Sequence, residues 1–216
     1  MIVFVHGVPE TAALWDDVRA ALGRRDSIAV GLPGFGCPRP ADFAATKEAY
    51  VDWLIGELEK LGEPIDLVGH DWGGGFALRT ACVRPDLLRS WVCDAAGLGD
   101  LQFEWHEFAK VWQTPEAGEQ FFTMQLALPV EERALAFEPL GVPQARAREM
   151  AARIDQTMAD CILALYRSAT EIGTEWASGL RNATKPGLVV VPENDPFLIA
   201  DTALRTAQNC GARVER

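Results

Sequence analysis

The segment of this sequence best suited to covalent chemistry is GHDWG at residues 69–73. A reactive side chain between two glycines is typical of a nucleophile on a sharp, strained turn, because the glycines let the backbone close around it. Residues 65–68 before the turn predict a strand, and residues 73–83 after it predict a helix. We therefore predict that Asp71 is a catalytic nucleophile, ionised at neutral pH because the positive end of that helix favours an anion. An ordinary turn aspartate is the alternative interpretation.

A carboxylate nucleophile limits the reaction that such a site can perform. It attacks esters and amides poorly but can displace a leaving group from sp³ carbon, which leaves an alkyl ester on Asp71. Water must then attack the ester carbonyl, and this step needs an oxyanion hole and a general base. The expected oxyanion-hole donors are the backbone N–H groups of Trp72 and Val8, since Val8 follows the first predicted strand. The tight turn at that point also suggests a cis peptide bond before Pro9.

The elements that must position these residues alternate between strand and helix. Short apolar runs predict strands, and capped or amphipathic segments between the first four of them predict helices. The predicted strands cover residues 2–5, 27–32, 65–68, 88–93 and 187–191. This alternation indicates an α/β fold with a mostly parallel sheet and helices on both faces.

The pattern changes between residues 97 and 185, where no strand-like run occurs and aromatic residues follow helical spacing. A helical block inserted between two strands indicates a lid over the carboxyl ends of the strands, where open α/β sheets bind ligands. We therefore expect a core of residues 1–97 and 187–216 and a lid, or cap, of residues 98–186. Most of the lid aromatics should only pack against one another. The candidate substrate contacts among them are Trp105, Phe108 and Trp112.

Composition and charge exclude several classes of protein. With 216 residues the chain can form one core with an insertion, and its formal net charge of −11 argues against nucleic acid or a membrane surface as a partner. Five scattered cysteines without a CxxC spacing argue against a disulfide framework or a zinc site. No signal peptide, membrane span or cofactor motif is evident, so we expect a cytoplasmic protein without metal or cofactor.

Three segments taken together resemble the α/β-hydrolase superfamily, in the branch of epoxide hydrolases and haloalkane or haloacid dehalogenases. They are HGVPE at residues 6–10, LPGFG at 32–36 and GHDWGGG at 69–75. The resemblance implies an α/β-hydrolase fold in which the aspartate of the sharp turn attacks carbon. It also implies an acid, placed after a later strand, that orients a histidine, and this histidine activates water.

The acid of that implied triad has two candidate positions. The segment VPENDPF at residues 191–197 follows a predicted strand and resembles the loop that carries the acid in this branch, which makes Asp195 the first candidate. An aspartate at the start of a helix is the alternative interpretation of Asp195. Asp94, at the end of the fourth predicted strand, is the second candidate for the acid.

The lid residues bear on which of the two reactions is catalysed. The resemblance implies two lid tyrosines that protonate the epoxide oxygen in epoxide hydrolases; Tyr166, followed by Arg167, matches the second, and Phe108 takes the place of the first. For dehalogenation, the indole N–H of Trp72 could hold a leaving halide with a second donor from Trp112 or Tyr166. We favour an epoxide hydrolase acting on a small apolar epoxide, with an alkyl-halide dehalogenase as the alternative.

The resemblance also implies a general-base histidine after Asp195, and the sequence has only His6, His70 and His106. We interpret His6 and His70 as structural, and His106 lacks a matching acid. Residues 211–216 resemble the approach to a last strand, so the C-terminal strand and the histidine loop are expected to be missing. The chain is then either a shortened hydrolase or a protein that binds a small molecule or partner without catalysis. An open sheet edge would favour a homodimer.

Overall fold

The computed structural model describes residues 1–94 and 97–216 of the chain. Its strands form one sheet in the order β2-β1-β3-β4-β5-β6, and every neighbouring pair is parallel. The strands are β1 (Ile2–Val5), β2 (Ser27–Val30), β3 (Ile65–Gly69), β4 (Leu88–Asp94), β5 (Gly187–Val190) and β6 (Arg213–Glu215). Because parallel neighbours need long crossover connections, this sheet confirms the α/β class that the strand–helix alternation predicts.

The helices between the strands begin and end close to the predicted positions. The side chain of Thr46 accepts the N–H of Ala49 and caps α2, and Gly23 ends α1 with a φ of 61°. The first predicted helix opens as a short 3₁₀ turn before it becomes α-helical. The helices that accompany the sheet are η1 (Ala12–Trp15), α1 (Asp16–Leu22), α2 (Lys47–Glu59), α3 (Trp72–Val83), η2 (Pro85–Leu87) and α10 (Ala200–Cys210).

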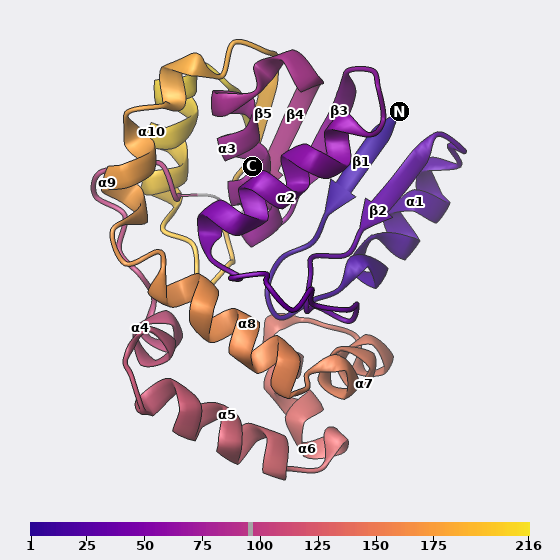
Figure 1. The fold of residues 1–216 in the computed structure, drawn as a ribbon, viewed down its shortest axis with the longest axis vertical. Coiled ribbons are helices and arrows are strands. Elements are labelled where there is room, and N and C mark those ends of the chain that lie inside the picture. Colours follow the sequence, from indigo (N-terminus) through magenta and orange to yellow (C-terminus); the bar gives the residue numbers. More distant parts are fainter. Residues whose placement is uncertain (95–96) are drawn as a thin grey trace.

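Between β4 and β5, the described residues 97–186 form helices joined by loops and contain no strand. It contains α4 (Glu107–Gln113), α5 (Ala117–Ala127), α6 (Val130–Ala134), η3 (Leu135–Leu140), α7 (Gln144–Arg153), α8 (Gln156–Arg167), α9 (Ile172–Ala177) and η4 (Leu180–Asn182). Helices α4 to α8 lie beyond the end of the sheet toward which β1 runs (Figure 1). The division of the chain into a core and a lid stays a prediction.

Contacts at the end of α8 attach this helical segment to the sheet layers. The hydroxyl of Ser168 accepts the backbone N–H of Lys47 at 2.9 Å, and the Lys47 ammonium bonds the Ser168 carbonyl. The buried Lys47 side chain also pairs with Glu48 at 2.7 Å and with Glu175 at 2.9 Å. A buried ammonium without partners would be costly, so these contacts fix the start of α2 against the end of α8 and the start of α9.

One continuous apolar core links the sheet to α8. It includes Val3 of β1, Leu67 of β3 and Phe76 of α3, and it extends to Ile162 and Leu165 of α8. A smaller cluster lies within the helical segment and consists of Ala134, Phe137, Ala147 and Ala151. The position of α8 at the end of the sheet therefore depends on apolar burial as well as on the contacts of Lys47.

The end of the sheet differs from the sequence-based expectation. The sequence predicts only an approach to a strand at residues 211–216, whereas the structure contains the strand itself: Leu188 to Val190 of β5 pair with Arg213 to Glu215 of β6. The segment Arg213–Glu215 is too short and too polar to be recognised as a strand from its own residues. It is a strand because it pairs with β5. All three residues of β6 are exposed. The homodimer stays a prediction.

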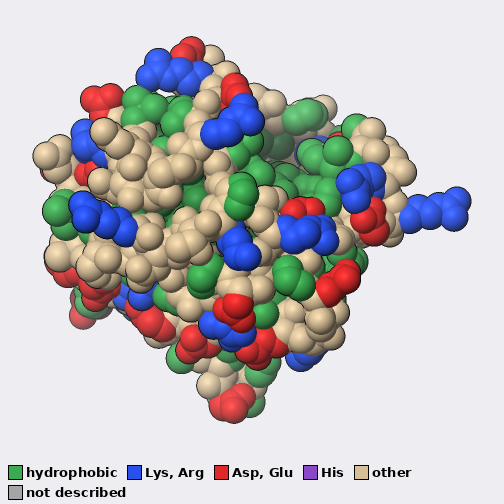
Figure 2. Space-filling view, turned by 90° about the horizontal axis from the view of Figure 1, so that it is seen from above, with side chains coloured by type: hydrophobic (Ala, Val, Ile, Leu, Met, Phe, Trp, Pro, Cys, Tyr) green, Lys and Arg blue, Asp and Glu red, His purple; other side chains and the backbone are tan. Residues whose placement is uncertain are grey.

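The surface and the helices give two further observations. Seen from above, acidic and basic side chains are interspersed, so the net negative charge forms no single patch on this face (Figure 2). Within residues 1–94 and 97–216, no helix has both the length and the apolar character needed to cross a bilayer.

The glycines after Asp71 allow α3 to pack directly against the backbone of β1. A Cβ at Gly73 would overlap the carbonyl oxygens of Val5 and His6, and a Cβ at Gly74 would lie 2.7 Å from the carbonyl oxygen of Asp94. Because these neighbours are backbone atoms, they cannot move aside without disturbing the sheet. Glycine is therefore required at this approach for steric reasons.

We expect Gly73→Ala to destabilise the fold by about 1–3 kcal/mol, because the added methyl group overpacks α3 against β1. The measurement is urea unfolding followed by far-UV circular dichroism. The matched control is Gly56→Ala in α2, where an added Cβ meets nothing within 4 Å. That control should be neutral or stabilising by up to about 1 kcal/mol, since alanine is the better helix former. Equal stability of the two variants would contradict the packing argument.

Candidate active site

Asp71 occupies the sharp turn that the sequence predicts between β3 and α3. Its backbone has φ 51° and ψ −121°, a conformation rarely adopted by a residue other than glycine, at a cost of about 1–3 kcal/mol. The turn is fixed on both sides: the N–H of His70 bonds the carbonyl of Val5 at 3.0 Å, and the N–H of Gly75 bonds the carbonyl of Asp71 at 3.0 Å. A Cβ at Gly7 would overlap the Asp71 side chain, so that glycine leaves room for the carboxylate.

The two predicted oxyanion-hole donors converge on the Asp71 carboxylate. The backbone N–H of Val8 donates to Oδ1 of Asp71 at 2.8 Å. The backbone N–H of Trp72 lies at the start of α3, and its proximity lowers the pKa of this carboxylate. The Val8–Pro9 peptide bond is cis, which confirms the sequence-based prediction. The loop after β1 and the start of α3 therefore present N–H groups to one carboxylate, although residues 8 and 72 are far apart in the sequence.

The ionisation of Asp71 differs from the sequence-based prediction of a fully ionised carboxylate. Burial raises the pKa of Asp71 to about 7; the nearby charge of Glu10 acts in the same direction, while the charge of His70 and the N–H groups of Trp72 and Val8 oppose it. The start of a helix is therefore not enough to offset burial. Protonated and ionised forms of Asp71 coexist near neutral pH.

A cluster of charged side chains lies beside Asp71, and its centre is His70. The Nδ1 atom of His70 lies 2.7 Å from Oδ1 of Asp94, and its Nε2 atom lies 3.3 Å from Oε1 of Glu10. Burial by itself would lower the pKa of His70, but the side-chain hydrogen bonds to Asp94 and Glu10 outweigh it and raise the pKa to about 11. Glu10 was not predicted to lie at the site, although its place directly after Pro9 in the HGVPE segment was a usable signal.

His6 has the turn-stabilising place that the sequence analysis favours. Its Nδ1 donates to the carbonyl of Gly7 at 2.8 Å, and its Nε2 accepts the backbone N–H of Leu32 at 3.0 Å. Burial lowers the pKa of His6 to about 4, so the ring is neutral at physiological pH. His6 thereby joins the loop after β1 to the loop after β2.

Tyr166 and three tryptophans form an aromatic group next to Asp71. The ring of Trp72 lies 5.5 Å from Tyr166 and 5.6 Å from Trp105, and Trp112 lies 4.8 Å from Tyr166. Burial, with the nearby charge of Asp71, raises the pKa of Tyr166 well above its ordinary value. The phenol therefore keeps its proton and can act only as a neutral hydrogen-bond donor or acid.

The two remaining predicted substrate contacts, Trp112 and Phe108, differ in their exposure to solvent. Trp112 packs on Tyr166, and its indole Nε1 is buried without a hydrogen-bond partner among residues 1–94 and 97–216. Phe108 is 51% exposed and packs on Trp112, Phe121 and Phe197. The structure thus places Trp112 beside the group and Phe108 at its outer edge.

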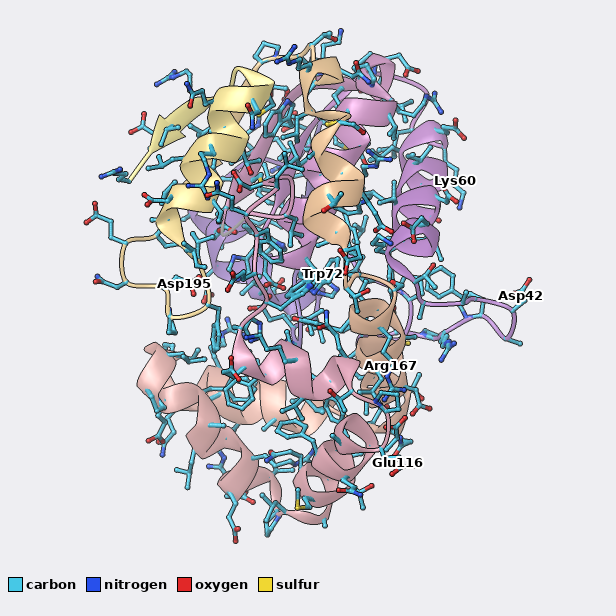
Figure 3. The ribbon with its side chains drawn as sticks, turned by 90° about the vertical axis from the view of Figure 1, so that its left-hand side faces the viewer. Asp42, Lys60, Trp72, Glu116, Arg167 and Asp195 are labelled. Carbon is cyan, nitrogen blue, oxygen red and sulfur yellow. The ribbon has the colours of Figure 1, made fainter. Side chains whose placement is uncertain are left out.

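Arg167 contributes structure rather than a group at the site. Its guanidinium makes two 2.7 Å bonds to the carboxylate of Glu119, and so it ties α8 to α5. Figure 3 shows the Arg167 side chain apart from Trp72. The neighbouring Tyr166 is therefore the member of this pair that faces the aromatic group.

Asp195 lies on the loop after β5, as predicted, on the opposite side of the molecule from Arg167 (Figure 3). Its Oδ1 accepts the backbone N–H of Phe197 at 2.8 Å, and within the described residues no hydrogen bond or ion pair joins it to a histidine. Its charge acts on His106, where burial lowers the pKa and Asp195 opposes that shift. The Nδ1 atom of His106 accepts the N–H of Ala109 and caps α4. The role of Asp195 as triad acid stays a prediction.

The described residues contain no group of three or more His, Cys, Asp or Glu side chains arranged to hold a metal ion. The charged cluster around His70 is instead saturated by its own ion pairs. The site therefore contains a partly buried carboxylate, a backbone N–H that donates to it, and a protonated phenol close by.

Comparison with known proteins identifies the family. The sequence model of the alpha/beta hydrolase family matches residues 2–215. A 2-hydroxymuconate semialdehyde hydrolase of Pseudomonas sp. (strain CF600) is 34% identical over 97 residues, which are 42% of this chain and 34% of that protein. Epoxide hydrolase 2 of Siraitia grosvenorii is 36% identical over 102 residues, 42% of this chain and 30% of that protein. The matched segments thus span about a third of these relatives.

The fold is shared with solved structures along nearly the whole chain. The haloalkane dehalogenase DbeA from Bradyrhizobium elkani USDA94 superposes with a TM-score of 0.73 at 20% identity, over 99% of this chain and 81% of that one. Likeness at this identity establishes the architecture and not the reaction. Together with the match over residues 2–215, it shows that the chain belongs to the α/β hydrolase family.

Proposed function

We propose that this α/β hydrolase uses Asp71 as its nucleophile and acts on small apolar epoxides through an alkyl ester on Asp71. The observation that carries the proposal is the hydrogen bond from the N–H of Val8 to the Asp71 carboxylate, in a turn with φ 51° that leads directly into α3. This arrangement suits a carboxylate that becomes an ester whose carbonyl oxygen needs stabilisation. The similarity to an epoxide hydrolase adds support.

In the first proposed step, Oδ2 of Asp71 attacks a carbon of the epoxide while Oδ1 stays bonded to the N–H of Val8. The carbon–oxygen bond of the ring breaks as the ester bond forms. The released oxygen takes a proton from the Tyr166 hydroxyl, which its raised pKa keeps in the protonated form. The three tryptophans around Tyr166 exclude water and suit an apolar substrate.

The second step, hydrolysis of the ester, needs a base that activates water, and the three histidines are poorly disposed to supply it. Both ring nitrogens of His6 are hydrogen bonded, and both of His70 face carboxylates. His106 uses Nδ1 to cap α4. For the 216-residue chain we therefore propose that alkylation of Asp71 outpaces hydrolysis of the ester.

A dehalogenase is the second candidate, because the site also holds indole groups. Trp72 directly follows Asp71, and the buried Nε1 of Trp112 has no partner among the described residues. Two indole N–H groups could stabilise a leaving halide. In this reaction Asp71 would displace halide from an alkyl carbon, and no proton from Tyr166 would be needed.

Incubation with styrene oxide should give a covalent adduct of one epoxide mass on Asp71 that persists for hours. The adduct is measured by intact-mass spectrometry and located by peptide mapping. Asp71→Asn, which keeps the shape but removes the charge, should remain unmodified. An unmodified wild type under conditions where the epoxide binds would favour a binding protein without catalysis. Steady diol formation would show that another group supplies the base.

Replacement of Tyr166 by Phe should slow alkylation by epoxide about 10²-fold or more while leaving alkylation by 1-bromobutane within a few-fold, because only the epoxide oxygen needs the phenol proton. Rates of adduct formation and of bromide release are measured in parallel. A wild type that releases bromide faster than it reacts with epoxide would favour the dehalogenase.

The rate of alkylation should rise tenfold per pH unit below about pH 7 and level off above it. The reason is that burial raises the pKa of Asp71 to about 7 and only the ionised form attacks. The check is the initial rate of adduct formation between pH 5 and 9. A flat profile over this range would mean that the Asp71 carboxylate is not titrating in the reactive state.

A further inference from the structure

An unbroken chain of contacts runs from the loop after β1 to the backbone of Asp71. Oε2 of Glu10 accepts the N–H of Gly7 at 3.0 Å, and Oε1 of Glu10 lies 3.3 Å from Nε2 of His70. Nδ1 of His70 lies 2.7 Å from Oδ1 of Asp94, and the same oxygen accepts the N–H of Asp71 at 3.2 Å. The chain therefore connects the ends of β1, β3 and β4.

Both ring nitrogens of His70 face carboxylate oxygens, which determines the form of the ring. A neutral imidazole has one N–H and would turn a lone pair toward one of the two carboxylates, whereas an imidazolium donates from both nitrogens. Only 13% of the Glu10 side chain is exposed, and 30% of those of His70 and Asp94. Little solvent is therefore present to screen the two negative charges, and the positive charge must come from the ring.

The position of this chain relates it to the oxyanion hole. Glu10 anchors the loop that presents the N–H of Val8, and Asp94 anchors the backbone of the turn that presents Asp71. His70 is the link between these two anchors. A change in its charge or length would alter both the separation of the two parts and the electrostatic field at the carboxylate.

The groups that face the Asp71 carboxylate come from several elements. Glu10 comes from the loop after β1 and His70 follows β3, while the rings of His6 and Tyr166 are neutral. Asp94, at the end of β4, contacts the backbone N–H of Asp71 and the ring of His70. His70 is thus the cation that opposes two nearby carboxylates. Removal of the His70 charge should therefore raise the pKa of Asp71, and removal of the Glu10 charge should lower it.

We propose that His70 is a positioning residue: a permanent imidazolium that holds the two parts of the oxyanion hole at their working separation and offsets the negative charge around Asp71. The effect on reactivity rests on the proposed function. The charge state of His70 does not, and it is measured separately.

The first measurement uses the wild-type protein without a tag and labelled with ¹⁵N-histidine. At pH 8 the three histidines should give one imidazolium and two neutral rings, because His6 and His106 have lowered pKa values and His70 has a raised one. Three neutral rings at pH 8 would overturn the inference. This spectrum requires neither activity nor a variant.

The second measurement is the pH profile of Asp71 alkylation in His70→Gln and Glu10→Gln. Loss of the cation should move the midpoint up by about one pH unit, a tenfold change in the ionisation constant, and loss of Glu10 should move it down. A merely structural role would slow both variants without moving the midpoints apart. The control is Glu57→Gln, whose partner is the exposed Lys60, and it should leave the midpoint unchanged.

The outcomes separate the two proposals. If the wild type forms no adduct, the proposed function fails, and the histidine spectrum alone decides the inference. If adduct forms and the midpoints of His70→Gln and Glu10→Gln coincide, the inference fails while the proposed function stands. Should His70→Gln not fold, the downward shift in Glu10→Gln and the histidine spectrum remain decisive.

Discussion

Partial burial of the Asp71 carboxylate at the ends of β1, β3 and β4 is the constraint on which the rest of the site depends. A buried carboxylate is unstable unless hydrogen-bond donors and positive charge compensate it. Here the N–H of Val8 donates at 2.8 Å, the start of α3 lies behind the side chain, and the charge of His70 lowers the pKa. The compensation is incomplete, since the pKa stays near 7. A carboxylate with a pKa near 7 is present in both its protonated and its ionised form at neutral pH.

The same burial explains why glycine surrounds the turn. The carboxylate can lie under the loop after β1 only because Gly7 has no side chain, and α3 can begin there only because Gly73 touches the backbone of β1. The conformation of Asp71, with φ 51°, is held by the packing on both sides. The close packing, the hydrogen bonds and the charged partners around Asp71 therefore all follow from placing its carboxylate under the loop after β1.

The two acids considered for a triad have different surroundings, and the difference is one of tertiary contact. Asp94 is in contact with His70 at 2.7 Å and with the backbone of Asp71, so it belongs to the charge cluster. Asp195 bonds the N–H of Phe197 in its own loop. The helical segment, in turn, brings Tyr166 to 5.5 Å from Trp72 and leaves Phe108 at the outer edge. Which of the predicted residues contact one another therefore depends on tertiary packing and cannot be read from their positions in the sequence.

The sequence by itself determined the local features: the strand–turn–helix around Asp71, the strand–helix alternation and the family motifs, because short-range sterics and periodicity specify them. It also predicted that the N–H of Val8 lies at the Asp71 site, and this N–H donates to Oδ1 of Asp71. Only the tertiary structure decided that His70 lies between Glu10 and Asp94, that burial outweighs the helix start in the ionisation of Asp71, and that Arg213–Glu215 form a strand. These features depend on distances between residues far apart in the chain, and no local pattern encodes such distances.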